Sequence, residues 1–225
     1  KPEDLVIMTN DEYKFHVIAD LDALSEGLSR DVVLEPARRN TAPAIALALK
    51  YCTEKLGCDP DEVLFISPSD HVISTQQEVS GYLRKAEEIA RKGHIVTFGV
   101  TPKRPETGYG YIKTGEKSGE FHRVQGFTEK PDPETARRYL TEGGYLWNSG
   151  MFVWRVDRIL AEIGVQMPEL RAVLEQLESA WNTSRQDRVL RSLWSGLRTE
   201  TIDYGIMEHA QKVAVLPAEG LEWSD

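Results

Sequence analysis

Short apolar runs alternate with longer amphipathic stretches through the first hundred residues of the chain. The apolar runs predict four strands, over residues 5–9, 32–34, 63–66 and 95–100. The stretches between them predict helices over 12–24, from about Pro43 to Gly57 with Asn40 or Thr41 as its cap, and from the Thr75–Glu78 capping box to Gly93. The third run is apolar at every position, which is typical of a parallel strand covered on both faces. We therefore expect an α/β fold, a three-layer sandwich with a Rossmann-like, mixed but mostly parallel sheet.

The second half of the chain has a different pattern, in which strands follow one another more closely. Asp132-Pro133 is typical of a helix start and Gly143-Gly144 of a helix stop. The other elements expected there are strands at 109–113 and 121–127 joined by a polar turn at 115–119, a strand at 145–155 bent at Asn148-Ser149-Gly150, helical structure at 156–196 and 199–209, and strands at 213–216 and 221–223. No internal repeat or long linker interrupts the sequence, so we expect one domain over residues 1–225.

Composition and charge narrow the class of protein. With 40% hydrophobic and 28% charged residues, the chain can build an ordinary globular core. Its net charge of −9 disfavours a general nucleic-acid binder, which is normally basic. The longest apolar run, Ala42 to Leu49, is too short to span a bilayer, and Lys1 to Asp4 lack the pattern of a signal peptide. We expect a cytoplasmic protein that binds neither nucleic acid nor membrane.

Polar residues gather directly after the predicted strands. In open α/β sheets, ligands bind beyond the carboxyl ends of the strands, so these positions are the candidate site. The segments concerned are Arg38–Thr41, Ser67–His71, Thr101–Gly110, Glu129–Pro131 and Trp223–Asp225. Together they supply two acids suited to a hard metal, several cations and several glycines. This set predicts a phosphorylated substrate and Mg²⁺.

Each of these features also has a purely structural interpretation. Asp70 could cap a turn, and Lys130 beside Glu129 could form a surface ion pair. Asn148-Ser149-Gly150 could be a plain turn, although polar residues between Trp147 and Met151 cost free energy unless they are used. We interpret His71 as a hydrogen-bonding structural residue rather than a general base.

Motifs of several common enzyme classes are missing from the sequence. It contains no Walker A motif, no Gly-x-Gly-x-x-Gly after a strand and no Gly-x-Ser-x-Gly elbow. It also contains no His-Glu-x-x-His and no Cys-x-x-Cys. P-loop kinases, dehydrogenases, serine hydrolases and zinc enzymes are therefore disfavoured.

Seven motifs, taken in order, resemble the bacterial mannose-1-phosphate guanylyltransferases, a family of sugar nucleotidyltransferases. They are EPARRNTAPAIALAL (35–49), ISPSDHVI (66–73), PETGYGYIK (105–113), FTEKPD (127–132), WNSGMFVW (147–154), IDYGIME (202–208) and WSD (223–225). Each motif alone is weak, but seven in the family's order over nearly the whole chain are specific. The Arg-Asn-Thr-Ala-Pro and Pro-x-Asp-His stretches favour this family over its thymidylyl and uridylyl relatives.

The resemblance implies a reaction of GTP with mannose 1-phosphate that gives GDP-mannose and pyrophosphate. The sugar phosphate would attack the α-phosphate in line, assisted by Mg²⁺ and without a general base. The resemblance implies that Asp70 and Asp225 bind the metal and that Lys130 contacts the sugar phosphate. It implies that Glu129 and Asn148 contact sugar hydroxyls, that the backbone at Gly108 approaches the sugar closely, and that Asp203 supports substrate binding. The residues implied to lie on the nucleotide side are Asn40, Thr41, Pro68 and Ser69. Of these, Lys130, Asp70 and Asp225 would be catalytic, and a homodimer is common among such relatives.

The sequence departs from the family pattern in one respect. The family's opening strand and its loop Gly-x-Gly-x-Arg-x-x-Pro, as well as its C-terminal continuation, are not in this sequence. We expect a domain truncated at both ends relative to the family, which keeps the sugar half of the site and is nearly inactive alone. Two alternatives stay open: another sugar-1-phosphate nucleotidyltransferase, for example one that uses dTTP and glucose 1-phosphate, and a non-catalytic nucleotide-sugar-binding regulatory homologue.

Overall fold

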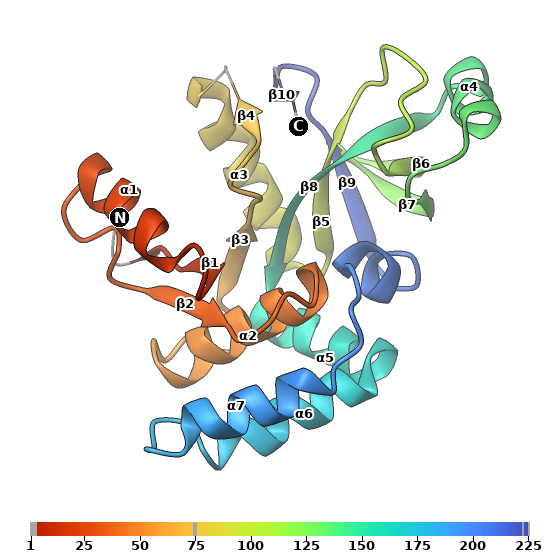
Figure 1. The fold of residues 1–225 in the computed structure, drawn as a ribbon. Coiled ribbons are helices and arrows are strands. Elements are labelled where there is room, and N and C mark those ends of the chain that lie inside the picture. Colours follow the sequence, from red (N-terminus) through yellow and green to blue (C-terminus); the bar gives the residue numbers. More distant parts are fainter. Residues whose placement is uncertain (1–3, 74–75, 222, 225) are drawn as a thin grey trace. The chain divides into compact units, whose positions relative to one another are not determined.

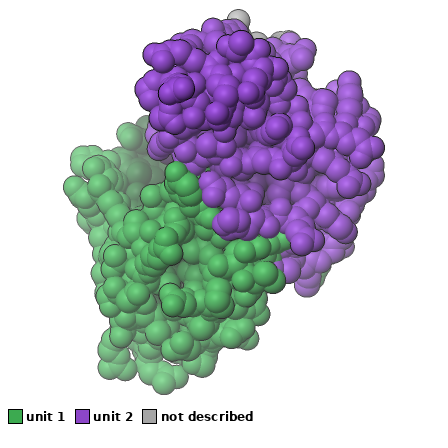
Figure 2. Space-filling view, turned by 90° about the vertical axis from the view of Figure 1, so that its right-hand side faces the viewer, with its two compact units in different colours: residues 1–59, 162–206 green, residues 60–161, 207–225 purple. Residues whose placement is uncertain are grey.

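The computed structural model describes residues 4–73, 76–221 and 223–224 (Figure 1). Its internal contacts divide the chain into two units, coloured separately in Figure 2. Unit 1 consists of residues 1–59 and 162–206, and unit 2 of residues 60–161 and 207–225. Each unit is therefore built from two stretches of sequence that are far apart along the chain.

Unit 1 combines a two-stranded parallel sheet with a group of helices. Strand β1 (Ile7–Asn10) pairs in parallel with β2 (Val32–Glu35), as the strand–helix–strand pattern predicts. The helices are α1 (Lys14–Leu24), α2 (Thr41–Glu54), α6 (Pro168–Glu178) and α7 (Gln186–Ser195). Apolar side chains of α2, α6 and α7, such as Leu47, Leu170 and Trp194, are fully buried. Lys50 of α2 reaches Glu54 at 2.9 Å and Glu178 of α6 at 3.3 Å, which ties these two helices together.

Unit 2 is organised around a six-stranded sheet in the order β3-β8-β5-β9-β7-β6. The strands are β3 (Val63–Ile66), β5 (Ile95–Val100), β6 (Tyr111–Ser118), β7 (Phe121–Thr128), β8 (Tyr145–Arg155) and β9 (Val213–Pro217). Strand β6 also pairs with β8, so β8, β5, β9, β7 and β6 form a closed ring of five strands. A second, two-stranded sheet joins β4 (Val72–Ile73) to β10 (Trp223–Ser224).

The direction of the strands in the large sheet differs from the prediction. Among the described strand pairs of this sheet, β5–β9 is parallel and the others are antiparallel. The mixed α/β class is confirmed, but the expected mostly parallel, Rossmann-like sheet is wrong here. The continuous apolar run of β3 predicts a parallel strand covered on both faces. In the structure β3 runs antiparallel to β8, and Phe65 is 43% exposed. An apolar run carries no information on strand direction.

One face of this sheet is covered by α3 (Gln76–Arg91), whose apolar side chains enter the main core of unit 2. Ala86, Ile89 and Ala90 of this helix belong to one buried cluster with Phe98 of β5 and Leu216 of β9. The helical spacing of Ala86, Ile89 and Ala90 had placed them on a single face. A smaller cluster joins Ala136 of α4 (Pro133–Glu142) to Tyr111 of β6 and Trp147 of β8.

Most local predictions are confirmed, and the exceptions have local causes. Asn40 and Asp132 are the N-caps of α2 and α4, and β3, β5 and β8 have the predicted bounds. The polar turn predicted at 115–119 is present but shorter, at residues 119–120, because β6 continues to Ser118 through irregular pairing with β7. The helical stretch 156–196 divides into α5 (Val156–Gln166), α6 and α7, and the short helix expected at 199–209 is a π-helical turn, η2 (Asp203–Met207). Strand β4 was not predicted.

Candidate functional site

Strand β8 changes partners halfway along one of its edges. On that edge it pairs with β6 over Tyr145–Trp147 and with β3 over Phe152–Arg155. On the other edge it pairs with β5, and the register between these two strands shifts between Thr97 and Gly99. Residues 148–151 therefore form a bulge at the place where the first edge passes from one neighbour to the other. Bulges commonly re-aim side chains next to functional sites.

Two segments with predicted site residues lie against this bulge. The segment Ser67–His71 follows the end of β3, and a Cβ atom on Gly150 would lie 3.5 Å from Pro68 Cγ and 3.5 Å from His71 Cε1. On the other side, the main-chain N–H of Asn148 donates to the oxygen of Gly110, just before β6, at 2.8 Å. Gly150 has a φ of +69°, a conformation that favours glycine.

The predicted sugar-binding pair, Glu129 and Asn148, comes together at Gly110. Glu129 follows the end of β7, and its side chain is only 11% exposed. A Cβ atom on Gly110 would lie 2.5 Å from Glu129 Oε2, so the glycine makes room for this carboxylate, and it would be in ordinary contact with Asn148 Cβ at 3.4 Å. Asn148 itself is 8% exposed. A carboxylate and an amide that are both buried beside a bare stretch of backbone can accept and donate hydrogen bonds at a polar ligand.

The two glycines of the Gly-Tyr-Gly stretch have different surroundings within the chain, while the approach of a sugar to Gly108 stays a prediction. A Cβ atom on Gly108 would meet only Glu106 Oε1, at an ordinary contact distance of 3.5 Å. The close approach within the chain is at Gly110, which we had not singled out. The contact partners of the two glycines come from distant strands, so the spacing of the motif alone could not distinguish them.

Lys130 has an unusual backbone conformation. Its φ is +43°, in the left-handed region that residues with a Cβ atom rarely adopt. Its side chain is 63% exposed, and Nζ lies 3.8 Å from Glu129 Oε1. An ion pair this long and exposed contributes little to stability, so the alternative of a structural ion pair does not explain the strained backbone. Such strain is concentrated at functional sites.

The loop that leads to Gly110 is organised by one carboxylate. Glu106 Oε1 accepts hydrogen bonds from the main-chain N–H groups of Thr107 at 3.0 Å and Gly108 at 3.2 Å, while Arg104 Nε donates to Oε2 at 3.0 Å. The hydrogen bond from Gly108, followed by that from Arg104, lowers the pKa of Glu106. The Arg104 guanidinium also lies 5.6 Å from the centre of the Trp147 ring. The ionised carboxylate therefore fixes the path of the chain before Gly110.

Aromatic contacts connect this loop to the segment after β3. The Tyr109 ring lies 5.3 Å from Trp147 and 5.0 Å from Trp223, measured between ring centres. The Trp223 Nε1–H group donates to His71 Nδ1 at 3.1 Å. A His71 ring that accepts at Nδ1 carries its proton on Nε2 when neutral, which supports the structural interpretation of this residue. Trp147, at 4% exposure, is a core residue, as expected.

Of the two predicted metal ligands, the structure describes Asp70 and not Asp225. Asp70 is exposed on the loop between β3 and β4, beside half-buried Pro68 and exposed Ser69. Asp225 lies outside the described residues. Strand β10 ends at Ser224, which pairs with Val72, two residues after Asp70. Among the described residues, no three His, Cys, Asp or Glu side chains form a metal-binding group. The carboxylate of Asp70 nevertheless has the oxygen-donor chemistry that Mg²⁺ prefers.

The predicted residues of unit 1 are brought together by the start of α2. Asn40 has a φ of +69°, and its side chain accepts from the N–H of Thr41 at 2.8 Å. Thr41 Oγ1 accepts from the N–H of Ile202 at 2.8 Å, and Asp203 follows directly as the first residue of η2. The N–H of Ala42 donates to the Glu200 oxygen at 3.1 Å. The first donors of α2 are thus bonded within the chain, so this helix start is not an open anion site.

Glu35 is a candidate that sequence reasoning missed. It ends β2, directly before the loop that carries Asn40 and Thr41. In the described part of the chain, its Oε2 atom is buried and has no hydrogen-bond partner. Burial raises the pKa of Glu35, an effect partly offset by a main-chain hydrogen bond from Arg39 and the charge of Arg38. A buried acceptor without a partner costs free energy, which is typical of a position kept for binding.

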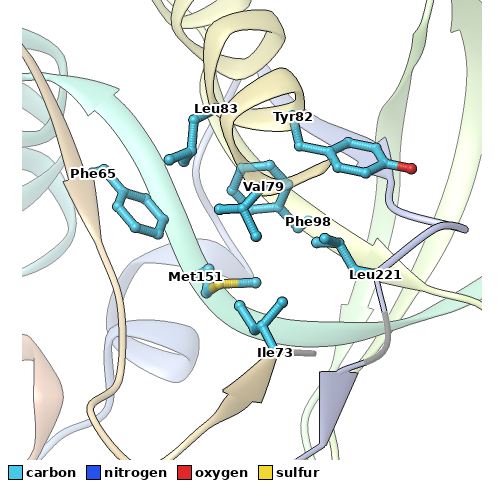
Figure 3. A pocket seen from close by; sticks show the side chains of 8 residues that line it. All are labelled: Phe65, Ile73, Val79, Tyr82, Leu83, Phe98, Met151 and Leu221. Atoms are coloured by element: carbon cyan, nitrogen blue, oxygen red, sulfur yellow. The ribbon is translucent and has the colours of Figure 1, made fainter. Parts of the chain in front are cut away.

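An apolar pocket of unit 2 does not have the chemistry of the predicted site (Figure 3). Figure 3 shows Val79 and Leu83 of α3 facing Phe98 and Met151. Phe65, Ile73, Tyr82 and Leu221 complete the lining. The Tyr82 hydroxyl already accepts a hydrogen bond from the Gly220 N–H at 3.1 Å. A phosphorylated ligand would find no cation there, so this pocket is part of the core packing.

No helix in residues 4–73, 76–221 and 223–224 combines the length and apolar character needed to cross a bilayer.

Comparisons with known proteins agree with the motifs. A family model described as nucleotidyl transferase matches residues 1–224. Mannose-1-phosphate guanylyltransferase RfbM of Salmonella typhimurium is 38% identical over 225 residues, which cover 99% of this chain and 46% of that protein. The mannose-1-phosphate guanylyltransferase of Escherichia coli K12 is 38% identical over 229 residues, which cover 99% and 47%. The chain spans about half the length of these curated relatives. The resemblance inferred from the seven motifs is confirmed.

Two solved structures are similar over nearly the whole chain. A Thermus thermophilus protein that carries the name mannose-1-phosphate geranyltransferase has a TM-score of 0.85 at 30% identity, over 99% of this chain and 61% of that one. A Helicobacter pylori protein named mannose-6-phosphate isomerase has a TM-score of 0.80 at 27% identity, over 98% and 84%. Both likenesses support the mixed α/β fold.

The substitution Glu35→Gln tests the buried carboxylate through the pH dependence of stability. Because burial raises the pKa of Glu35, the folded state favours the protonated form, and the favourable contribution of this group is lost as pH rises through its folded pKa. We expect the amide variant to have a higher melting temperature than the unsubstituted protein at pH 7. The difference should shrink as pH falls below the usual range of glutamate. Thermal unfolding between pH 4 and pH 8 measures it.

Glu26→Gln is the matched control, because Glu26 is an exposed glutamate of the same unit. It should leave the melting temperature unchanged across this range. A Glu35→Gln variant that is less stable than the unsubstituted protein at pH 7 would contradict the interpretation.

Proposed function

Because the chain belongs to the nucleotidyl transferase family, we propose that its natural protein is a mannose-1-phosphate guanylyltransferase. The reaction joins GTP and mannose 1-phosphate to give GDP-mannose and pyrophosphate. The observation that carries the proposal is the meeting of Glu129 and Asn148 at Gly110, beside the bulge of β8. The guanylyltransferases that are 38% identical over nearly the whole chain support the choice of substrates.

The chemistry of the residues suits a sugar phosphate. Glu129 can accept hydrogen bonds from sugar hydroxyls, and Asn148 can both donate and accept. Lys130, whose ammonium group is largely exposed, supplies a positive charge for the phosphate next to that pair. Asp203 would support substrate binding from unit 1, and Gly108 remains a proposed point of backbone approach to the sugar.

The proposed reaction needs no general base from the protein. A sugar phosphate has a second pKa of about 6, so its attacking oxygen is already ionised near neutral pH. The protein's contribution is then to position the two substrates in line and to neutralise charge. This agrees with a structural role for His71, whose Nδ1 atom accepts a hydrogen bond from Trp223.

Asp70 and Asp225 are the residues that would hold Mg²⁺ in this proposal. When bound, the ion would neutralise the charge of the nucleotide and sugar phosphates. For the nucleotide, we propose contacts from Asn40, Thr41, Pro68 and Ser69. The Asn40 side chain and the Thr41 hydroxyl already accept hydrogen bonds within the chain. Their contribution would therefore come through the shape of the loop.

Pyrophosphate release by the natural protein tests the proposed substrates. We expect turnover with GTP and mannose 1-phosphate in the presence of Mg²⁺, and little with dTTP and glucose 1-phosphate. Lys130→Gln should raise the KM for mannose 1-phosphate roughly 10-fold or more, as expected for the loss of a charge-assisted hydrogen bond, with little effect on the KM for GTP. Lys117→Gln, which removes an exposed lysine of β6, is the control and should have no effect.

Faster turnover with another sugar phosphate would reject the substrate assignment. Equal effects of the two lysine substitutions would reject the role of Lys130. Binding of GDP-mannose without turnover under any condition would favour the regulatory homologue.

A pair of glycine substitutions tests the geometry of the sugar site. Gly110→Ala would bring a Cβ atom to 2.5 Å from Glu129 Oε2 and must displace that side chain. We expect the KM for mannose 1-phosphate to rise by roughly 10-fold, because a hydrogen bond to a charged group is lost. Gly108→Ala meets only an ordinary contact and is the comparison, measured in the same assay. A larger effect at Gly108 than at Gly110 would show that the sugar approaches the chain at Gly108.

A further inference from the structure

A single hydroxyl is buried in the middle of the core strand β5. Every residue of this strand is buried, and Thr97 is 0% exposed. Val96 and Phe98, whose side chains point to the opposite face of the strand, belong to the main apolar cluster of unit 2. A fully buried hydroxyl costs free energy unless it is bonded, and valine would fill the same space without that cost. The threonine therefore points to a specific polar contact.

The contact is with both ends of the β8 bulge. Thr97 Oγ1 lies 2.9 Å from Asn148 Oδ1 and 3.1 Å from the main-chain oxygen of Met151. Thr97 is paired with Phe152 and Gly99 with Asn148, so two steps along β5 face four steps along β8. The Thr97 hydroxyl has one proton to share between these two oxygen acceptors. Because the acceptors belong to Asn148 and Met151, the hydroxyl links the two ends of the bulge.

We propose that Thr97 is a positioning residue for sugar-phosphate binding, because its hydroxyl holds the side-chain oxygen of Asn148, a residue that lies with Glu129 beside Gly110. The inference rests on the proposed function and adds to it a residue that no sugar atom touches. Thr97 acts through Asn148, because its hydroxyl adds a restraint on the direction in which that side chain presents its amide group. Fixing one rotamer in advance lowers the entropy lost on binding.

The main chain of the bulge has other restraints, so loss of the hydroxyl should not unfold it. The N–H of Asn148 donates to the Gly110 oxygen at 2.8 Å, and the N–H of Met151 donates to Ser149 Oγ at 3.3 Å. Regular pairing with β3 and β6 flanks the bulge on either side. The substitution Thr97→Val therefore keeps the backbone path and removes this one hydrogen bond from the Asn148 side chain.

The test compares three variants of the natural protein. Thr97→Val should raise the KM for mannose 1-phosphate about 5- to 10-fold, the effect expected for one lost hydrogen bond, and leave the KM for GTP unchanged. Thr97→Ser keeps the hydroxyl and should restore the KM to within about 2-fold of the unsubstituted protein. Val96→Ala lowers stability in the same strand but retains Thr97, and its KM should not change. Equal KM changes in Thr97→Val and Val96→Ala would overturn the proposal.

A second measurement separates this inference from the proposed function. The side-chain amide signals of Asn148 in a nitrogen–proton NMR spectrum, assigned with Asn148→Asp, report the orientation of that group without any substrate. They should shift in Thr97→Val and not in Val96→Ala. Unchanged signals in Thr97→Val would overturn the link between Thr97 and Asn148 whatever the kinetics. Shifted signals in a protein that does not turn over GTP and mannose 1-phosphate would support the link and reject the proposed function.

Discussion

The structure of unit 2 depends on how β8 shares its hydrogen bonds among three neighbours. One edge of this strand serves β5, while the other serves β6 in its first part and β3 in its last part. A strand cannot change partners on one edge without a break in regular pairing, and the break is the bulge at residues 148–151. Closure of the ring through β6 and β8 requires this arrangement. The loops after β3 and before β6 therefore meet β8 at the same place.

The chemistry of the candidate site follows from that break. At the bulge, Asn148 lies beside the backbone at Gly110, and Glu129 at the end of β7 reaches the same point. Asn148 is buried and the Glu129 side chain is 11% exposed, whereas the ammonium group of Lys130 is exposed on a strained backbone. A buried polar pair beside an exposed cation suits a ligand with hydroxyls at one end and a phosphate at the other. Within unit 1, the start of α2 is bonded to the chain before η2.

The sequence predicts the elements of this fold better than their connections. The bounds of β3, β5 and β8 and the caps Asn40 and Asp132 depend on local patterns, which a single sequence contains. Glu129 could be found because it follows a strand, where ligands of α/β sheets bind, and Asn148 because a polar residue within an apolar strand is unusual, while their roles came from the family resemblance. Gly110 and Thr97 could not, since their roles depend on contacts with distant strands. Strand direction was mispredicted for the same reason, because burial and not direction determines the apolar pattern.

The most direct test of the account is a crystal structure of the natural protein with GDP-mannose and Mg²⁺. The account predicts that the sugar lies against Gly110, with its hydroxyls within about 3 Å of Glu129 and Asn148 and its phosphate at Lys130. Thr97 should keep its contact with Asn148 in the complex. A sugar bound away from the β8 bulge, in contact with none of these side chains, would contradict the central claim.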